Sequence, residues 1–375
     1  MRGREVVVIG GGIIGCSAAT LLAEGGARVT LVESTALANG ASGRNSGSIQ
    51  HPFDPVLGAL HIRSLTLYRD LEQTDAFGLP AEPAGILLLT RDLDDAAQRA
   101  ADLQDEFSDL GAVALDPQAV SQLEPTIAPG WAAVLVHSGY PTRPDGATRA
   151  WAARAARAGV DIRVGAGARP VMEAGRIGGI DMTDGTHLAT DAVLLAAGPW
   201  VPDLLPSDGW RPAITRTWGV TVQVRPAAVP SHILEEGTVH TINVAGGMAV
   251  AGSDVPSIFS LMPAASLATI GSTFVATEPD PALVAPLLLE RAAAFVPGIA
   301  SAELIGFRVC GRPQSADGYP FIGPVPGVEG LTICAGHGPW GISTGPASAE
   351  LAVASMVSGT SVPNQLRAER EVRPA

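Results

Sequence analysis

The sequence contains no lysine, and all 24 of its basic residues are arginine. This absence excludes mechanisms that need a lysine amine, such as a Schiff base or a phosphate-loop lysine, because a guanidinium stays protonated at working pH. Charged residues make up only 16% of the chain, and the formal net charge is −13. The acidic balance argues against a nucleic-acid partner, because phosphate binding needs clustered positive charge.

Cysteine is also scarce. Cys16, Cys310 and Cys334 are too few and too scattered for a disulfide framework or a zinc site. We therefore expect a reduced, cytoplasmic protein without a metal. The length of 375 residues predicts about two domains, and the 44 glycines and 30 prolines predict many turns.

One uncharged stretch near the N-terminus permits another interpretation. Val6–Ala23 carries no charge and follows two arginines, and Ile13–Cys16 resembles a lipoprotein cleavage site. A secretion signal or membrane anchor is thus the first alternative. Glycines interrupt the apolar run, however, and a second strand-like run follows it, so we expect no membrane segment.

The same stretch has the pattern of a nucleotide-binding turn. Residues 6–9 are branched and predict a buried strand, and residues 13–24 predict a helix. Three glycines with the spacing Gly-x-Gly-x-x-Gly fall in the turn between them: Gly10, Gly12 and Gly15. The first permits a tight turn, the second lets backbone approach a pyrophosphate, and the third lets helix and strand pack closely.

A second strand strengthens this interpretation. Residues 28–33 predict a strand that ends in Glu33, where a carboxylate can bind ribose hydroxyls. The phosphates would lie on exposed N–H groups at the start of the helix, at Ile13 and Ile14. An ordinary glycine-rich turn in a βαβ unit is the alternative.

The next segment favours flavin over nicotinamide. Residues 39–49 form a polar, glycine-rich loop where a nicotinamide-binding fold would continue to a third strand, and a helix is predicted over 57–74. Such a loop suits contacts along an extended FAD, with Ser42, Asn45 and Ser46 as donors. The alternative is a flexible surface loop.

Five strings in this order resemble the D-amino acid oxidase-like flavoprotein superfamily, which includes glycine oxidase, sarcosine oxidase and D-amino acid dehydrogenase. They are VVVIGGGIIG with Glu33, GASGRNSGSI, AAGPW, RPQSADGYPFIG and GHGPWGISTGPAS. The resemblance covers nearly the whole chain. It implies an α/β fold in which a Rossmann-type FAD-binding domain carries an inserted substrate domain with a mixed or antiparallel sheet.

The resemblance also implies where the domains divide. The FAD-binding domain would comprise residues 1–83, 140–205 and 305–375, and the substrate domain residues 84–139 and 206–304. The local pattern agrees with this alternation, because it predicts a helix and five strands outside the motifs, over 147–158, 160–164, 192–196, 218–224, 247–252 and 331–335.

Further cofactor contacts follow from the resemblance. Val171 would meet the adenine end of FAD, and Ala197 and Gly198 its central portion. A helix predicted over 344–357 follows a glycine-rich turn whose N–H groups would face the flavin's pyrimidine edge, at Gly338, Gly341, Ile342 and Ser343. His337 in this turn is interpreted as a histidine that hydrogen-bonds backbone rather than as a catalytic base.

Arg312 matches the arginine that pairs with the substrate carboxylate in glycine oxidase and its relatives. A planar guanidinium binds a carboxylate through two parallel hydrogen bonds and would fix the α-carbon over the flavin. The alternative is an ion pair with the neighbouring Asp317. The resemblance implies oxidation of the C–N bond of an amino acid or N-substituted amino acid by hydride transfer to flavin N5, giving an imine that hydrolyses. No acid–base pair is named.

The substrate region departs from the superfamily. Relatives place tyrosines over the substrate, whereas this chain has three tyrosines in all and offers His240, Thr241 and Asn243 in the corresponding region. Tyr140 and His51 are further candidate substrate contacts. Cys310 falls where sarcosine oxidase-type relatives link the flavin covalently, although cysteine also commonly fills core positions.

Three functions remain open at this point. The first is the oxidation of a carboxylate-bearing amine. The others are a 2-hydroxy acid dehydrogenase, which GRNSG also resembles, and a flavin electron carrier, which would not need Arg312. The electron acceptor is oxygen, or a partner or quinone. Sarcosine oxidase-type relatives activate oxygen with a lysine, which this chain lacks.

Overall fold

The computed structural model describes residues 3–207, 209–237, 248–249 and 255–372. Its first sheet has the strand order β19-β20-β12-β1-β2-β8 and is parallel except at β19. Branched residues make β1 and β2 suited to a buried sheet. The strands span Glu5–Ile9 (β1), Arg28–Glu33 (β2), Asp161–Val164 (β8), Ala192–Leu195 (β12), Phe321–Pro324 (β19) and Leu331–Ala335 (β20).

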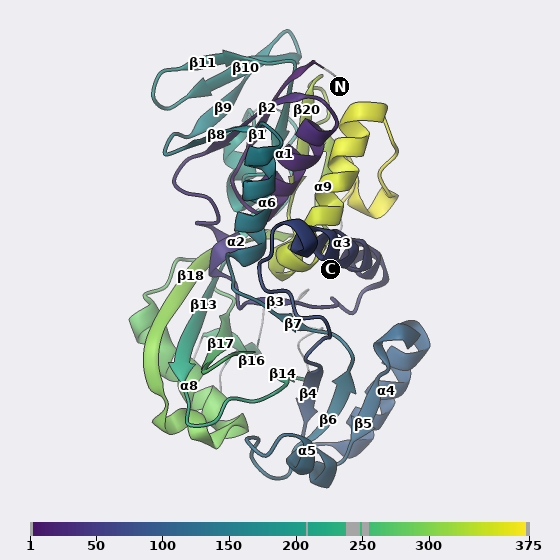
Figure 1. Ribbon diagram of the computed structural model, residues 1–375, viewed down its shortest axis with the longest axis vertical. Coiled ribbons are helices and arrows are strands. Elements are labelled where there is room, and N and C mark those ends of the chain that lie inside the picture. Colours follow the sequence, from purple (N-terminus) through teal and green to yellow (C-terminus); the bar gives the residue numbers. More distant parts are fainter. Residues whose placement is uncertain (1–2, 208, 238–247, 250–254, 373–375) are drawn as a thin grey trace.

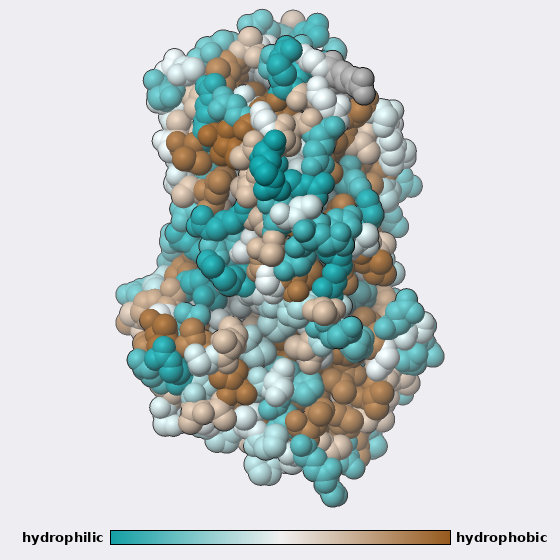
Figure 2. All heavy atoms as spheres, in the orientation of Figure 1, coloured by the Kyte–Doolittle hydropathy of each residue, from teal (hydrophilic) through white to brown (hydrophobic). Residues whose placement is uncertain are grey.

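Helices cover one face of this sheet. They are α1 (Ile13–Glu24), α3 (Pro55–Thr74), α6 (Gly146–Arg157) and α9 (Gly341–Ser358), and they pack together in Figure 1. Val6 and Val8 of β1 share a core with them. The outer side of α6 carries exposed arginines, and the surface over α6 is correspondingly hydrophilic in Figure 2.

A small antiparallel sheet covers the opposite face. It contains β9 (Ala168–Glu173), β10 (Arg176–Met182) and β11 (His187–Ala189). Val7 and Ile9, which alternate with Val6 and Val8, pack against its buried residues. Alternate side chains of β1 thus pack into two different cores, one on each face of the sheet. The carboxyl end of β1 lies between these two cores.

The second large sheet forms the lower part of Figure 1. Its order is β18-β13-β17-β16-β14-β4-β6-β5, with β15 paired to β16, and it is mixed because β14 and β4 run parallel. The strands span Ile86–Thr90 (β4), Val113–Leu115 (β5), Ala132–Val136 (β6), Ile214–Arg225 (β13), Ile233–Glu236 (β14), Met248–Ala249 (β15), Pro256–Ala264 (β16), Leu267–Thr273 (β17) and Glu303–Ser315 (β18).

Helix α8 (Pro281–Phe295) packs on one face of this sheet through residues such as Leu288 and Phe295. The peripheral elements are α4 (Leu93–Glu106), α5 (Pro117–Leu123), and the pair β3 (Ser48–Ile49) and β7 (Tyr140–Pro141). Among the described residues, no helix combines the length and apolar character needed to cross a membrane.

The Rossmann-type α/β architecture with a second, mixed sheet is confirmed. The domain boundaries stay a prediction, and one of them divides an element: β18 lies in the second sheet, although the predicted FAD-binding domain resumes at residue 305. Two local details also differ. The loop 39–49 contains a short helix, α2 (Ala41–Arg44), and only Met248–Ala249 of the strand predicted over 247–252 is described.

Candidate active site

A cavity of about 630 Å³ lies between the parallel sheet and the mixed sheet. It begins at the carboxyl ends of β1, β2 and β12, which is where open α/β sheets bind their ligands. Most of the residues predicted for the site line it: Gly10, Gly12, Ile13, Ile14, Glu33, Ser42, Asn45, Ser46, Ala197, Gly198, Cys310, Arg312, Gly338, Gly341, Ile342 and Ser343.

The glycine turn is closed by backbone contacts. Gly10 has φ +118°, and a Cβ there would lie 2.4 Å from the Ala196 carbonyl oxygen. A Cβ on Gly15 would lie 1.8 Å from the Gly10 carbonyl oxygen. Gly15 does not line the cavity; it lets α1 approach the turn, as the spacing predicts.

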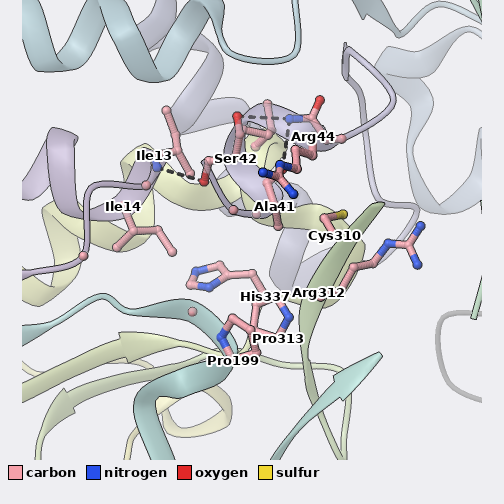
Figure 3. Close-up of a pocket in the computed structure, with 18 of the residues that line it drawn as sticks. Ile13, Ile14, Ala41, Ser42, Arg44, Pro199, Cys310, Arg312, Pro313 and His337 are labelled. Atoms are coloured by element: carbon pink, nitrogen blue, oxygen red, sulfur yellow. Dashed lines mark hydrogen bonds between the residues drawn. The ribbon is translucent and has the colours of Figure 1, made fainter. Parts of the chain in front are cut away.

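Two side chains fix the turn from outside. The Gly11 N–H donates to Glu33 Oε2 at 2.8 Å, and the Ile13 N–H donates to Ser42 Oγ at 3.0 Å (Figure 3). The hydroxyl proton of Ser42 is then available to a ligand, and Glu33, whose Oε2 accepts one hydrogen bond, also lies in the lining of the cavity. The βαβ turn and the polar loop therefore form one wall.

The loop differs from the prediction at Asn45. Its Nδ2 lies within hydrogen-bonding distance of the carbonyl oxygens of Ala41, Ser42 and Pro144, and its Oδ1 accepts from the Gly47 N–H. Both N–H bonds are thus satisfied within the protein. Asn45 holds the loop in shape and has no side-chain N–H left to donate to a cofactor; its contact with the cofactor stays a prediction.

The glycine-rich turn before α9 places His337 in the cavity (Figure 3). Its side chain is 2% exposed, and neither ring nitrogen has a hydrogen-bond partner among the described residues. The interpretation as a backbone-bonding histidine is therefore wrong. Burial lowers the pKa of His337 to about 3, so the ring is neutral at working pH.

Arg312 extends from β18 into the cavity wall. Its Nη1 donates to the Thr273 carbonyl and its Nη2 to Ser272 Oγ, both at 2.8 Å. The guanidinium lies 4.6 Å from the ring centroid of Phe274. The alternative ion pair with Asp317 is wrong, because Asp317 pairs with Arg370 at 2.8 Å.

Cys310 lies two residues before Arg312 and also lines the cavity. Burial raises the pKa of its thiol, and this outweighs the opposite effect of Arg312, Arg44 and Arg308. The thiol is therefore favoured over the thiolate. Its covalent link to a flavin stays the alternative that the resemblance implies.

Three predicted contacts lie elsewhere, and one lies outside the described residues. Val171 lies in β9, and the cavity instead reaches the residues two to four positions before Val171, which are Gly167, Ala168 and Arg169. His51 is buried among aromatic rings, and Tyr140 lies under the Arg69 guanidinium. None of the three lines the cavity. The candidate His240 belongs to the segment that is not described.

Sequence reasoning missed several polar residues of the wall. Arg44 lies within the quoted GRNSG string, which was the available signal, and its Nη2 donates to Asn39 Oδ1 at 2.7 Å. Gln50, Thr221 and Glu235 had no sequence signal. They meet only because β13 and β14 and the segment after β3 converge on the cavity.

The residues present fit an FAD. Glycines without side chains form one wall, and the N-terminal turn of α9 adds Gly341, Ile342 and Ser343. Several buried polar atoms of the wall have no hydrogen-bond partner among the described residues, which is expected where a polar ligand supplies the partners. These atoms are Ser48 Oγ, Gln50 Oε1, Thr221 Oγ1, Glu235 Oε2 and both ring nitrogens of His337.

Comparison with known proteins gives a consistent result. A family model described as FAD dependent oxidoreductase matches residues 5–355. The chain is 30% identical over 371 residues to a glycine oxidase of Pseudomonas aeruginosa, covering 95% of both, and 29% identical over 359 residues to that of Pseudomonas putida, covering 93% of both.

Solved structures share the fold at lower identity. Glycine oxidase from Geobacillus kaustophilus superimposes with a TM-score of 0.83 at 23% identity, with 100% of each chain covered. Iminodiacetate oxidase from Chelativorans gives a TM-score of 0.79 at 24% identity, covering 96% of this chain and 97% of that one.

Proposed function

Because this chain belongs to the family of FAD-dependent oxidoreductases, we propose that it oxidises the C–N bond of an amino acid or an N-substituted amino acid whose carboxylate is bound by Arg312. The family match shows an FAD-dependent oxidoreductase, and the glycine oxidase relatives support amine oxidation at the level of the family. The identity of the substrate and the role of Arg312 are the proposal.

The proposal depends on the N–H donors of Arg312 that the protein itself does not use. A guanidinium has five N–H donors, and the hydrogen bonds to Thr273 and Ser272 use two of them. These bonds and Phe274 hold the group in one orientation while the remaining donors are available to the cavity. A carboxylate would take two parallel hydrogen bonds there, each shorter and stronger than a neutral one.

Gly219 makes this placement feasible. The guanidinium of Arg312 lies directly over it, because a Cβ at Gly219 would come within 2.3 Å of Nη2. Any other residue on β13 at this point would displace the arginine. An electron carrier has no need for such a preformed carboxylate site, so this feature disfavours that alternative.

When bound, FAD supplies the hydride acceptor. The contribution of the protein is then to bind and orient the substrate. Arg312 fixes the carboxylate and so limits the directions in which the α-carbon can point. His337 is neutral and buried, so it adds no charge that would repel Arg312. The names of the relatives, glycine oxidase and iminodiacetate oxidase, support a C–N substrate that carries a carboxylate.

Anaerobic mixing of the holoenzyme with amino, N-substituted amino and 2-hydroxy acids tests the proposal. We expect amino acids to bleach the flavin. Bleaching by hydroxy acids alone would establish the dehydrogenase alternative, and no bleaching by any of them would support the carrier.

Arg312→Ala should raise KM for the substrate by about tenfold or more, as expected for the loss of a charge-assisted pair. Arg308→Ala is the matched control, because Arg308 lies four residues earlier on the same strand and does not line the cavity. An unchanged KM in the Arg312 variant would contradict the assignment.

The acceptor is tested by reoxidation of the reduced enzyme in air. Without a lysine, oxygen reduction would rely on an arginine or a protonated histidine, and His337 is neutral. Slow reoxidation would therefore indicate a partner or quinone acceptor, and fast reoxidation would identify an oxidase.

A further inference from the structure

A second ionisable group, Glu235 on β14, lies in the same cavity as Arg312. It is 3% exposed. Gln50 Nε2 donates to its Oε1 at 2.9 Å, and its Oε2 has no hydrogen-bond partner among the described residues. Burying a carboxylate without a counterion costs several kcal/mol. A residue with this cost is expected to have a function that offsets it.

The neighbouring Glu236 provides an internal comparison. It points to the opposite face of the sheet, as successive strand residues do. There Arg291 of α8 donates from Nη2 to both carboxylate oxygens, at 2.7 and 2.8 Å, and from Nε to Oε2 at 3.1 Å, and the Phe259 N–H adds a fourth bond. The fold thus supplies a cation to the carboxylate on the structural face, whereas no described residue supplies one to the carboxylate on the cavity face.

Glu235 belongs to a row of directly paired residues. Across the sheet it pairs with Ser260 of β16, Ser260 pairs with Gly271 of β17, and Gly271 pairs with Thr221 of β13. Paired residues place their side chains on the same face. Glu235, Ser260 and Thr221 all line the cavity, and Gly271 leaves the floor between the two hydroxyl residues without a side chain. A polar strip therefore crosses the floor of the cavity.

Glu235 lies at one end of the strip, and Arg312 lies near the other end, which is Thr221 on β13. The Arg312 guanidinium lies over Gly219 on β13, and β17 and β16 separate β13 from β14. Three interstrand steps put the backbone of Glu235 about 14 Å from that of β13. The α-amino group of a substrate held at Arg312 is too close to its own carboxylate to span this distance, but a long side chain or N-substituent can.

We propose that Glu235, oriented by Gln50, binds a cationic nitrogen at the far end of the substrate, so that this enzyme oxidises basic amino acids or amino acids with a basic N-substituent. The inference rests on the proposed function, because it takes Arg312 as the carboxylate site. The net charge of −13 also favours the approach of cationic substrates. Burial raises the pKa of Glu235 to about 7, so pH 8 is suitable for the test because the carboxylate predominates there.

The test compares substrates matched in length. Both enantiomers of lysine and ornithine are assayed with the holoenzyme against norleucine and norvaline. The expected result is a KM for the basic members at least tenfold lower than for the neutral ones, and loss of this preference in Glu235→Gln. Glu278→Gln is the control, because Glu278 also lines the cavity but is exposed; it should keep the preference.

Ligand binding gives a second readout that needs no turnover. The dissociation constants of 6-aminohexanoate and hexanoate are measured from the flavin difference spectrum. Glu235→Gln should weaken the binding of 6-aminohexanoate about tenfold and leave hexanoate unchanged. If this variant does not fold, equal dissociation constants of the two ligands for the wild-type enzyme still overturn the inference.

The outcomes separate this inference from the proposed function. If neutral and basic amino acids bleach the flavin with equal KM in wild type and variant, the role of Glu235 is wrong and the proposed function stands. An equal loss for all substrates in the Glu235 variant would also overturn it, because it indicates a general structural effect. If no amino acid bleaches the flavin, the proposed function itself fails.

Discussion

The two ends of the cavity are built in different ways. At the cofactor end, backbone atoms and glycines form the wall, and Gly10 and Gly15 touch other backbone with no space for a Cβ. At the substrate end, side chains from separate strands form the wall, and Arg312 and the ionised form of Glu235 carry opposite charges. We expect the first end to bind its ligand by shape and phosphate charge, and the second to select its ligand by an arrangement of charges.

This difference determines which end tolerates change. A glycine in backbone contact cannot gain a methyl group without moving main chain, so substitutions there affect folding and cofactor binding together. Arg312 and Glu235 line the cavity, and we expect that replacing them changes what the cavity binds. We therefore expect members of one family to share the way in which the cofactor end is built and to differ in the side chains of the substrate end.

The largest effect is expected for Gly15→Ala. The added Cβ would lie 1.8 Å from the Gly10 carbonyl oxygen, so α1 and the turn must separate. We expect a loss of about 3 kcal/mol or more in the free energy of unfolding and failure to retain FAD. Urea unfolding and flavin absorbance of the purified protein measure both. Gly298→Ala is the control, because a Cβ there meets nothing within 4 Å. Full flavin content in the Gly15 variant would refute the backbone contact.

The same contrast explains what sequence could predict. The strand, turn, helix and second strand at residues 5–33 were predicted almost residue by residue, because glycine spacing and hydrophobic periodicity are local signals. The strand at 331–335 and the helix after it were also located. Arg312 was assigned from the resemblance of its string, and the structure adds its partners, Ser272 and Thr273.

The substrate end could not be predicted in this way. The row from Glu235 to Thr221 depends on the order β14-β16-β17-β13 and on the register between these strands. A register shift of one residue would turn Glu235 to the opposite face and bring Glu236 to the cavity, and no local pattern distinguishes the two. His51 was misplaced for a similar reason: it is next to Gln50 in sequence but packs away from the cavity.

A smaller effect on the free energy of unfolding is expected from two buried histidines, whose protonation makes stability depend on pH. Burial lowers the pKa of His61 to about 4 and that of His337 to about 3. Near pH 5 the unfolded chain, with a histidine pKa near 6.5, binds protons that the folded state does not, so stability falls as pH decreases below 6.5. Each should contribute about 1–2 kcal/mol of this loss at pH 5.

Urea unfolding at pH 7.5 and pH 5 measures this loss. His61→Leu should reduce the difference between the two pH values by about 1–2 kcal/mol. His137→Gln, at an exposed position, is the control and should leave the difference nearly unchanged. An identical pH difference in wild type and His61→Leu would show that His61 is protonated in the folded state.

A more modest effect is expected for Glu33→Gln at the cofactor end. The carboxylate accepts from the Gly11 and Thr35 N–H groups, and the amide can replace at most one of its two acceptor oxygens. We expect FAD affinity to fall about tenfold, as for the loss of one charge-assisted bond, with little change in the preference among substrates. Titration of the apoprotein with FAD measures this change. Glu24→Gln, at an exposed residue paired with Arg154, is the control. A changed substrate preference would indicate that the two ends are not independent.

The smallest effect is expected for Cys310→Ala, at the boundary between the two ends. Covalent attachment to a flavin requires a nucleophilic thiolate, and burial raises the pKa of this thiol despite the nearby arginines. Cys310 is buried and small, so alanine should fit with a loss of about 1 kcal/mol. We expect acid precipitation to release yellow flavin into the supernatant from both wild type and variant, with unchanged KM. A yellow pellet from the wild type that becomes colourless in the variant would establish the covalent link, and would place a side-chain bond at the end of the cavity that otherwise relies on backbone.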